Sequence, residues 1–201
     1  WVFIELKQAN NSEKVVATSA ALLQRNGHVI TADGDSILYF DNLPPDNYYV
    51  AVRHRNHLKV ETLQPYLFNE STIPYIDFTY NFLPIRGEVP FADSEAGNVL
   101  WSGDLNQDGK TIYQGPQNDI FHMFLQILLD SLNQDYLTNF INTGYTVNDF
   151  NLDGLTIYQG PNNDRSNLLF NTILKHPNNE TKVSNYILSV RENMELTNFE
   201  D

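Results

Sequence analysis

The chain contains no cysteine, and this absence excludes several kinds of structural and chemical site. A protein without cysteine forms no disulfide, binds no metal through thiolates and has no cysteine nucleophile. The sequence also lacks an apolar run of about 20 residues, the length that a membrane-spanning helix requires. We therefore expect a chain without a membrane span, folded without covalent cross-links.

Positive charge is also scarce. The 12 Lys and Arg residues are outnumbered by 25 Asp and Glu residues, and the formal net charge at pH 7 is -13. A phosphate backbone would be repelled, and no cluster of Lys and Arg could release its counterions, so we expect no nucleic-acid partner. A surplus of carboxylates is typical of proteins that bind divalent cations. Two calcium ions would change the net charge from -13 to -9.

The first 80 residues have the composition of β-structure. They are rich in β-branched and aromatic residues, and turn residues interrupt them at short intervals. This pattern predicts a mainly β chain with a small α part, beginning with an antiparallel β-sandwich. The stretch FDNLPPDNYYVAV resembles the strand-turn-strand of immunoglobulin-like or transthyretin-like modules of secreted proteins. The expected strands span residues 1–7, 14–24, 28–31, 37–40, 47–55 and 75–80.

Hydrophobic periodicity is lost after the last of these strands. Pro84, Gly87, Pro90 and Gly97 gather there, as in a connector. We therefore predict a β-sandwich domain over residues 1–82, a connector over 83–100 and a second module over 101–201.

An internal repeat dominates the second module. The first copy, D-L-N-Q-D-G-K-T-I-Y-Q-G-P-Q-N-D, starts at Asp104, and the second, D-F-N-L-D-G-L-T-I-Y-Q-G-P-N-N-D, starts at Asp149. The two copies are identical at twelve of sixteen positions. Apolar residues at helical spacing follow each copy, and they predict helices over residues 120–129 and 165–174. The repeated unit is therefore a loop followed by a helix.

The start of each copy has the residue types of a calcium loop. Such a loop needs oxygen side chains at positions 1, 3 and 5, glycine at position 6 and a backbone carbonyl at position 7. Magnesium is less expected, because it prefers smaller, water-rich octahedral sites. The predicted ligands are Asp104, Asn106, Asp108 and the carbonyl of Lys110 in the first copy, and Asp149, Asn151, Asp153 and the carbonyl of Leu155 in the second.

The closing ligand of an ordinary EF-hand loop is missing from both copies. Position 12, normally a bidentate glutamate, is Gly115 in the first copy and Gly160 in the second. Four residues further on, Asp119 and Asp164 stand at the predicted helix starts, where a carboxylate is favoured. We expect these two residues to close longer loops around two calcium ions.

The paired loops resemble the duplicated calcium loop-helix of dockerin modules. They depart from that pattern in the four extra residues before the closing Asp and in lacking the Ser/Thr and Lys/Arg recognition positions on the helices. The segments GDLNQDGKTIYQGPQND, NDFNLDGLTIYQGPNND, VVATSAALLQRNG and YYVAVRHRNHL are similar to the C-terminal region of large secreted surface proteins of environmental bacteria. This resemblance implies calcium binding and an extracellular or cell-surface location.

The motifs of common enzymes are missing from the sequence. There is no G-x-S-x-G elbow, phosphate-binding loop or H-E-x-x-H run, so we do not expect an enzyme. His54 and His57 are expected on opposite faces of one strand, which does not favour a zinc site. We expect an extracellular calcium-binding structural or adhesive protein. A homo-oligomer or surface filament could form by strand pairing through residues 1–7.

Two other functions fit the sequence. A docking module of a secreted multi-domain protein would show an exposed apolar patch on the loop-helix pair. A carbohydrate-binding module for a surface glycan would show a planar row of exposed aromatic residues, for which Tyr48, Tyr49, Tyr75 and Tyr80 are candidates.

Overall fold

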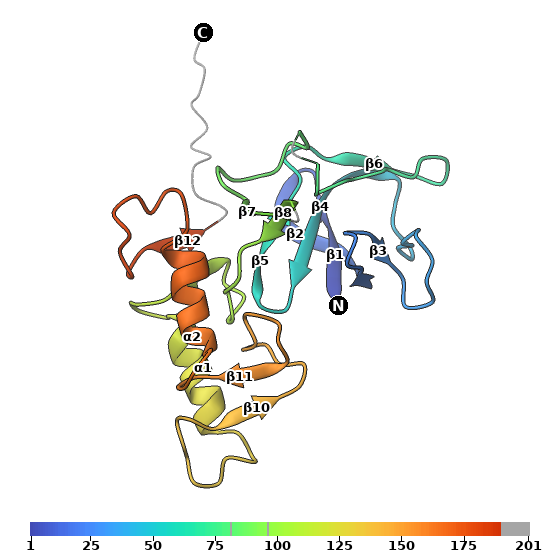
Figure 1. Cartoon of the computed structure of the whole chain (residues 1–201). Helices are drawn as coiled ribbons and strands as arrows, with labels where there is room; N and C mark the ends of the chain where they lie inside the picture. Colours follow the sequence, from blue (N-terminus) through green and yellow to red (C-terminus); the bar gives the residue numbers. More distant parts are fainter. Residues whose placement is uncertain (81, 96, 190–201) are drawn as a thin grey trace.

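The computed structural model describes residues 1–80, 82–95 and 97–189, and it is mainly β (Figure 1). The last twelve residues of the expected second module, 190–201, lie outside this description. No helix in the described segments is long and apolar enough to cross a membrane. The strands are β1 Val2–Gln8, β2 Asn11–Leu23, β3 Val29–Ile30, β4 Asp46–His54, β5 His57–Glu61, β6 Tyr66–Phe68, β7 Phe91–Ser94, β8 Gly97–Leu100, β9 Lys110–Ile112, β10 Ile141–Thr143, β11 Leu155–Ile157 and β12 Ile187–Ser189. The helices are α1 Asp119–Leu128, α2 Asp164–Asn167 and the π-helix η1 Leu168–Ile173.

The N-terminal part is one antiparallel sheet of six strands. Its order is β3-β2-β1-β4-β5, and β6 also pairs with β4. The first strand is therefore central, with β2 on one side and β4 on the other. Alternate residues Val2, Ile4 and Leu6 of β1 are buried with Tyr48 and Val50 of β4, as expected of strands with one face on a core.

The second sheet of the predicted sandwich is absent from the described residues. The strands predicted over 37–40 and 75–80 are wrong, because both segments are irregular. They still cover the sheet, since Phe40 and Phe78 pack against its core. Asp77 accepts a hydrogen bond from the backbone N–H of Thr79 at 2.9 Å, and a local turn of this kind competes with ladder pairing.

The predicted connector over residues 83–100 is more ordered than expected. It contains the β7–β8 hairpin, and Arg86 N–H donates to the carbonyl of Glu61 at the outer edge of β5. The Arg86 guanidinium also lies 3.4 Å from the Glu61 carboxylate, which pairs with buried Lys7. This segment therefore packs on the sheet.

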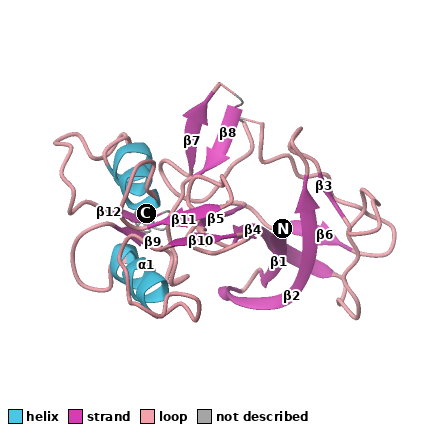
Figure 2. Cartoon of the chain, turned by 60° about the horizontal axis from the view of Figure 1, so that its bottom comes forward, coloured by secondary structure: helices cyan, strands magenta, loops and turns pink. Residues whose placement is uncertain are grey.

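The second part holds the two loop-helix units. The helix predicted over 120–129 is confirmed to within one residue by α1. The helix predicted over 165–174 is present as α2 continued by the π-helix η1. Two short ladders join the units, because β10 pairs with β11 and β12 pairs with β9. The strand that follows each helix thus pairs with the loop of the other unit, and in Figure 2 the helices lie on either side of these ladders.

The structural repeat extends well beyond the sixteen matching residues. Asn133 donates from its side-chain amide to the carbonyl of Ile127 at 2.8 Å and to that of Leu137 at 2.9 Å. Asn179 makes the equivalent bonds, at 2.8 and 2.9 Å, after the second helix. Asn179 lies 46 residues after Asn133, whereas the loops are 45 residues apart. The extra residue falls in the segment where η1 replaces α-helix, and a π-turn accommodates one added residue.

Candidate metal centre

Loop 1 (residues 104–119) and loop 2 (residues 149–164) are closed by equivalent hydrogen bonds at their first residue. The Asp104 carboxylate accepts from Gly109 N–H at 3.1 Å, and the Asp149 carboxylate accepts from Gly154 N–H at 3.0 Å. Both glycines have a φ of +84°, a conformation that side chains disfavour. The glycine at position 6 therefore permits the turn that the first aspartate stabilises.

The side chains at positions 3 and 5 each form a local Asx turn. Asn106 Oδ1 accepts from Asp108 N–H at 3.0 Å, and Asn151 Oδ1 accepts from Asp153 N–H at 2.9 Å. The carboxylates at position 5 accept in turn from the N–H groups of Lys110 and Leu155, at 2.9 and 2.8 Å. Position 7 is the first residue of β9 in loop 1 and of β11 in loop 2. All eight predicted ligands at positions 1 to 7 thus lie in matching geometry.

Asp119 and Asp164 join the two ends of their loops. Asp119 accepts from Leu105 N–H at 2.7 Å through one oxygen and from Ile112 N–H at 2.8 Å through the other. Asp164 makes the equivalent bonds with Phe150 and Ile157, at 2.8 and 2.9 Å. Both side chains are almost completely buried, with exposed fractions of 1% and 0%. The structure therefore brings both predicted closing residues to the loops, and metal ligation by them stays a prediction.

The helix starts that carry these aspartates are set locally. Asn118 Oδ1 accepts from Phe121 N–H at 2.7 Å, and Asn163 Oδ1 accepts from Ser166 N–H at 2.8 Å. Each asparagine is therefore an N-cap and fixes the first turn of its helix.

Negative charges are concentrated in the loops. Burial raises the pKa of Asp104 to about 7. The hydrogen bond from Gly109 N–H acts in the opposite direction, and the nearby carboxylates of Asp119 and Asp108 add to the rise. Burial also raises the pKa of Asp119 to about 6, with Asp108 acting in the same direction. The pKa of Asp164 rises to about 6 through burial and through Asp149. Carboxylates with raised pKa values are those that a bound cation would favour in charged form.

The oxygen atoms of the two loops are of the type that a hard cation prefers, but they are not yet close enough together to hold one. Carboxylate, amide and backbone carbonyl oxygens are the groups that calcium prefers, and neither loop contains histidine. Among the described residues, however, no group of three or more His, Asp or Glu side chains lies close enough together to hold a metal ion. The carboxylates instead accept backbone N–H groups. To bind a metal ion, the carboxylates would therefore have to give up some of these hydrogen bonds and coordinate the ion instead.

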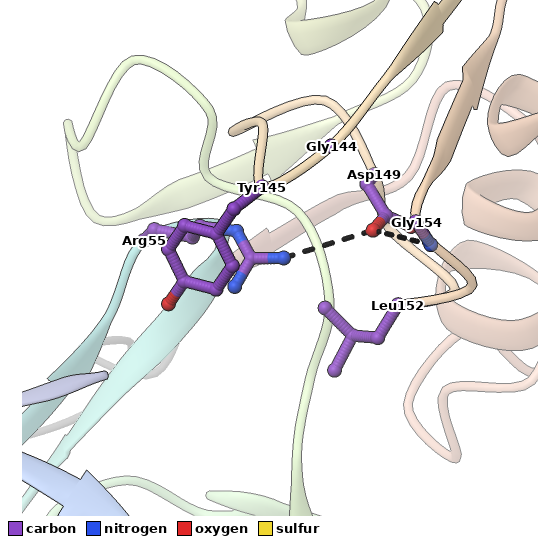
Figure 3. A pocket seen from close by; sticks show the side chains of 6 residues that line it. All are labelled: Arg55, Gly144, Tyr145, Asp149, Leu152 and Gly154. Atoms are coloured by element: carbon purple, nitrogen blue, oxygen red, sulfur yellow. Dashed lines mark hydrogen bonds and ion pairs between the residues drawn. The ribbon is translucent and has the colours of Figure 1, made fainter.

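Loop 2 has a cation beside it that the sequence did not reveal. The Arg55 side chain is only 12% exposed, and its Nη2 lies 3.7 Å from the Asp149 carboxylate. Arg55 also donates to the carbonyl of Thr146 at 2.7 Å and lies 3.6 Å from the centre of the Tyr145 ring. Figure 3 shows these side chains around a pocket of about 340 Å³, lined by Arg55, Gly144, Tyr145, Asp149, Leu152 and Gly154.

Asn56 connects the turn between β4 and β5 to both loops. Its side-chain amide donates to the carbonyl of Asp149 at 2.6 Å, and its own carbonyl accepts from Gly103 N–H at 2.9 Å. The residue is completely buried. The sheet and the two loops are therefore held together at this turn.

His54 and His57 lie together, so their expected placement on opposite faces is wrong. The strand ends at His54 and reverses through Arg55 and Asn56, which makes the two histidines cross-strand partners. Their Nδ1 atoms are 2.9 Å apart. Burial, with Arg55 nearby, lowers the pKa of His54 to about 4, and burial with His54 nearby lowers that of His57 to about 3. Both rings are therefore neutral at pH 7.

The four tyrosines proposed for sugar binding do not form one exposed row. Tyr48 is a core residue with an exposed fraction of 3%. Tyr49 is half-buried, with the Arg86 guanidinium 4.9 Å from its ring centre. Tyr75 and Tyr80 are exposed, at 85% and 59%. Two of the four candidates are therefore excluded as members of such a surface.

Comparisons with protein-family models, with curated proteins and with solved structures found no match to this chain.

Proposed function

We propose that this chain binds two calcium ions, one in each loop, and serves outside the cell as a structural or adhesive unit that calcium stiffens. The observation that carries the proposal is the matching geometry of the two loops, in each of which a buried aspartate at the helix start bonds to both ends of the loop. Burial raises the pKa values of Asp104, Asp119 and Asp164 to about 6 to 7. The extracellular location rests on the resemblance to secreted surface proteins.

Electrostatics support a divalent ion. Burying a carboxylate away from water is unfavourable unless a cation or enough donors compensate it. No Lys, Arg or His nitrogen of the described residues lies within 4.0 Å of an Asp104 or Asp119 oxygen. Calcium would supply the missing positive charge and accept the oxygen donors of both loops.

The strand pairing of the module supports a stiffening role. In loop 1, β9 begins at position 7 and pairs with β12, which follows the second helix. In loop 2, β11 begins at the same position and pairs with β10, which follows the first helix. An ion that orders one loop would therefore also order a strand of the other unit.

Calorimetric titration tests this function directly. Calcium added to the chelator-treated full chain should bind with a stoichiometry of two, and magnesium should bind more weakly. Binding to the folded state alone stabilises it by about 2.7 kcal/mol at a hundredfold excess over the dissociation constant. Titrations without calcium uptake would reject the function.

Self-association is proposed through β2 instead of the first strand. Strand β1 is paired on both sides within its own chain, so a neighbour could join it only by displacing β2 or β4. β3 pairs with Leu22 and Leu23 at the end of β2, which leaves Val15 and Val16 outside that ladder. Val15 and Val16 are 41% and 39% exposed. An edge strand with exposed apolar side chains can pair with another chain.

A docking function has a separate observation in its favour. Large apolar side chains are exposed on and after the first helix, at Phe121, Leu129, Leu132 and Tyr136. A patch of exposed apolar side chains marks a surface that a partner can cover. The calcium proposal does not depend on which of these contacts the unit makes.

A further inference from the structure

Arg55 places a positive charge beside loop 2 that has no counterpart at loop 1 among the described residues. We propose that Arg55 is a resident counter-cation of loop 2, so that loop 1 binds calcium first and loop 2 binds it more weakly, in competition with the guanidinium. This inference rests on the proposed function, because it assumes that both loops take calcium.

Three contacts hold Arg55 beside the first ligand position of loop 2. Its Nη2 lies 3.7 Å from the Asp149 carboxylate, its Nε donates to the Thr146 carbonyl at 2.7 Å, and its guanidinium carbon is 3.6 Å from the Tyr145 ring centre. In Figure 3 the Tyr145 ring lies across the guanidinium, which points toward Asp149. The positive charge is therefore held there by the first residue of loop 2 and by two residues just before the loop.

Loop 1 has no such cation among the described residues. The arginine that reaches it is Arg53, two residues earlier on β4, and it donates to the side-chain oxygen of Gln107 at 3.3 Å. The charge of Arg53 is already paired with Glu5, at 2.6 Å. No basic side chain of the described residues therefore lies beside Asp104, whereas Arg55 lies beside its counterpart Asp149.

The chemistry of arginine makes this difference matter. A guanidinium cannot lose its proton in a protein, so Arg55 cannot reduce its repulsion of an arriving ion by becoming neutral. Calcium that binds Asp149 must therefore compete with Arg55 for the carboxylate, and the repulsion between calcium and the guanidinium weakens its binding. The adjoining pocket, lined by both residues, leaves space in which the guanidinium can move.

The test compares calcium affinities of loop 2 in variants of the full chain. In a background where Asp104→Ala and Asp108→Ala silence loop 1, Arg55→Gln should raise the affinity of loop 2 about tenfold, as removal of a nearby like charge does. Arg55→Lys keeps the charge and should change the affinity less than threefold. Arg25→Gln removes an equal charge at an exposed turn and controls for net charge.

A second measurement avoids mutation at Arg55. The side-chain Nε–H resonance of Arg55 in the unaltered chain should shift during the second equivalent of calcium, after loop 1 has filled. Equal loop 2 affinities in Arg55→Gln and its parent, or an Arg55 resonance that shifts with the first equivalent, would overturn the inference while calcium binding stands. Absence of calcium uptake in every variant and in the unaltered chain would reject the proposed function as well.

Discussion

The side-chain amide of Asn56 donates to the backbone carbonyl of Asp149 at 2.6 Å, across 93 residues of sequence. A turn of the N-terminal sheet is therefore bonded to the first residue of loop 2. The same asparagine accepts from Gly103 N–H, just before loop 1. Asn56 is thus bonded both to the first residue of loop 2 and to the residue that precedes loop 1.

Replacing Asn56 with alanine should destabilise the whole chain. The substitution leaves the buried Asp149 carbonyl without this donor, and an unsatisfied buried polar group costs about 1–3 kcal/mol. Chemical denaturation of Asn56→Ala in chelator should show that loss in the free energy of unfolding. Asn139→Ala, at an exposed position, should change it by less than about 0.5 kcal/mol. Equal stabilities of the two variants would contradict the prediction.

Asp119 and Asp164 should each account for one calcium ion. Asp119→Asn and Asp164→Asn keep the shape of the side chain and remove its charge, so each should lower the calorimetric stoichiometry from two to one. Asn118→Ser and Asn163→Ser retain a capping oxygen at the neighbouring position and should leave it at two. A stoichiometry of two in both aspartate variants would place the closing ligand elsewhere.

Acidification from pH 8 to pH 6.5 should stabilise the calcium-free chain relative to its Asp104→Asn variant. The folded pKa of Asp104 is about 7, above its ordinary value of 3.8, so the folded state binds the proton more tightly than the unfolded state. Stability must then rise as pH falls through the folded pKa. His54, His57 and His176 have lowered pKa values and oppose this effect, because in the unfolded state they begin to take up protons above pH 6.5. Comparison with Asp104→Asn removes this contribution, since both chains carry the same histidines.

Thermal unfolding in chelator checks this pH dependence, with Asp104→Asn as the control that should show a smaller slope. With calcium present the slope should reverse, because protons compete with the ion for the same carboxylate. Equal changes of melting temperature in the unaltered chain and in Asp104→Asn between pH 8 and pH 6.5 would contradict the prediction.

Lysines on the open edge of β2 should prevent self-association. Val15→Lys with Val16→Lys adds charge to an exposed edge, a feature by which natural sheets resist edge pairing. Light scattering and electron microscopy with calcium should show monomers of this variant where the unaltered chain forms larger species. Val99→Lys, at a residue 39% exposed on the β7–β8 hairpin, is the control. Assemblies that persist in the double variant would exclude this edge.

Local patterns predicted much of the second module correctly. The paired loops, the glycine turns, the helix starts and the first helix all depend on contacts between residues close in sequence. Asx turns at positions 3 and 5 and the N-caps at Asn118 and Asn163 span two or three residues. For this reason a repeated motif of sixteen residues was enough to locate both loops.

Other features could not be read from such patterns. The single added residue in η1 shifts the alignment of the two units, which hides the matching Asn133 and Asn179. The segments over 37–40 and 75–80 have strand composition, but whether apolar residues pair in a ladder or only cover a sheet depends on distant partners.

The amino-acid sequence by itself therefore determined the mainly β composition, the negative charge, the duplicated loops and the residues that could hold an ion. Only the tertiary structure decided that β1 lies between β2 and β4, that His54 meets His57 and that Arg55 lies beside Asp149. The physical reason is the range of the interactions. A turn or a cap is stabilised within a few residues, whereas strand order and the place of one charge beside another depend on how the whole chain packs.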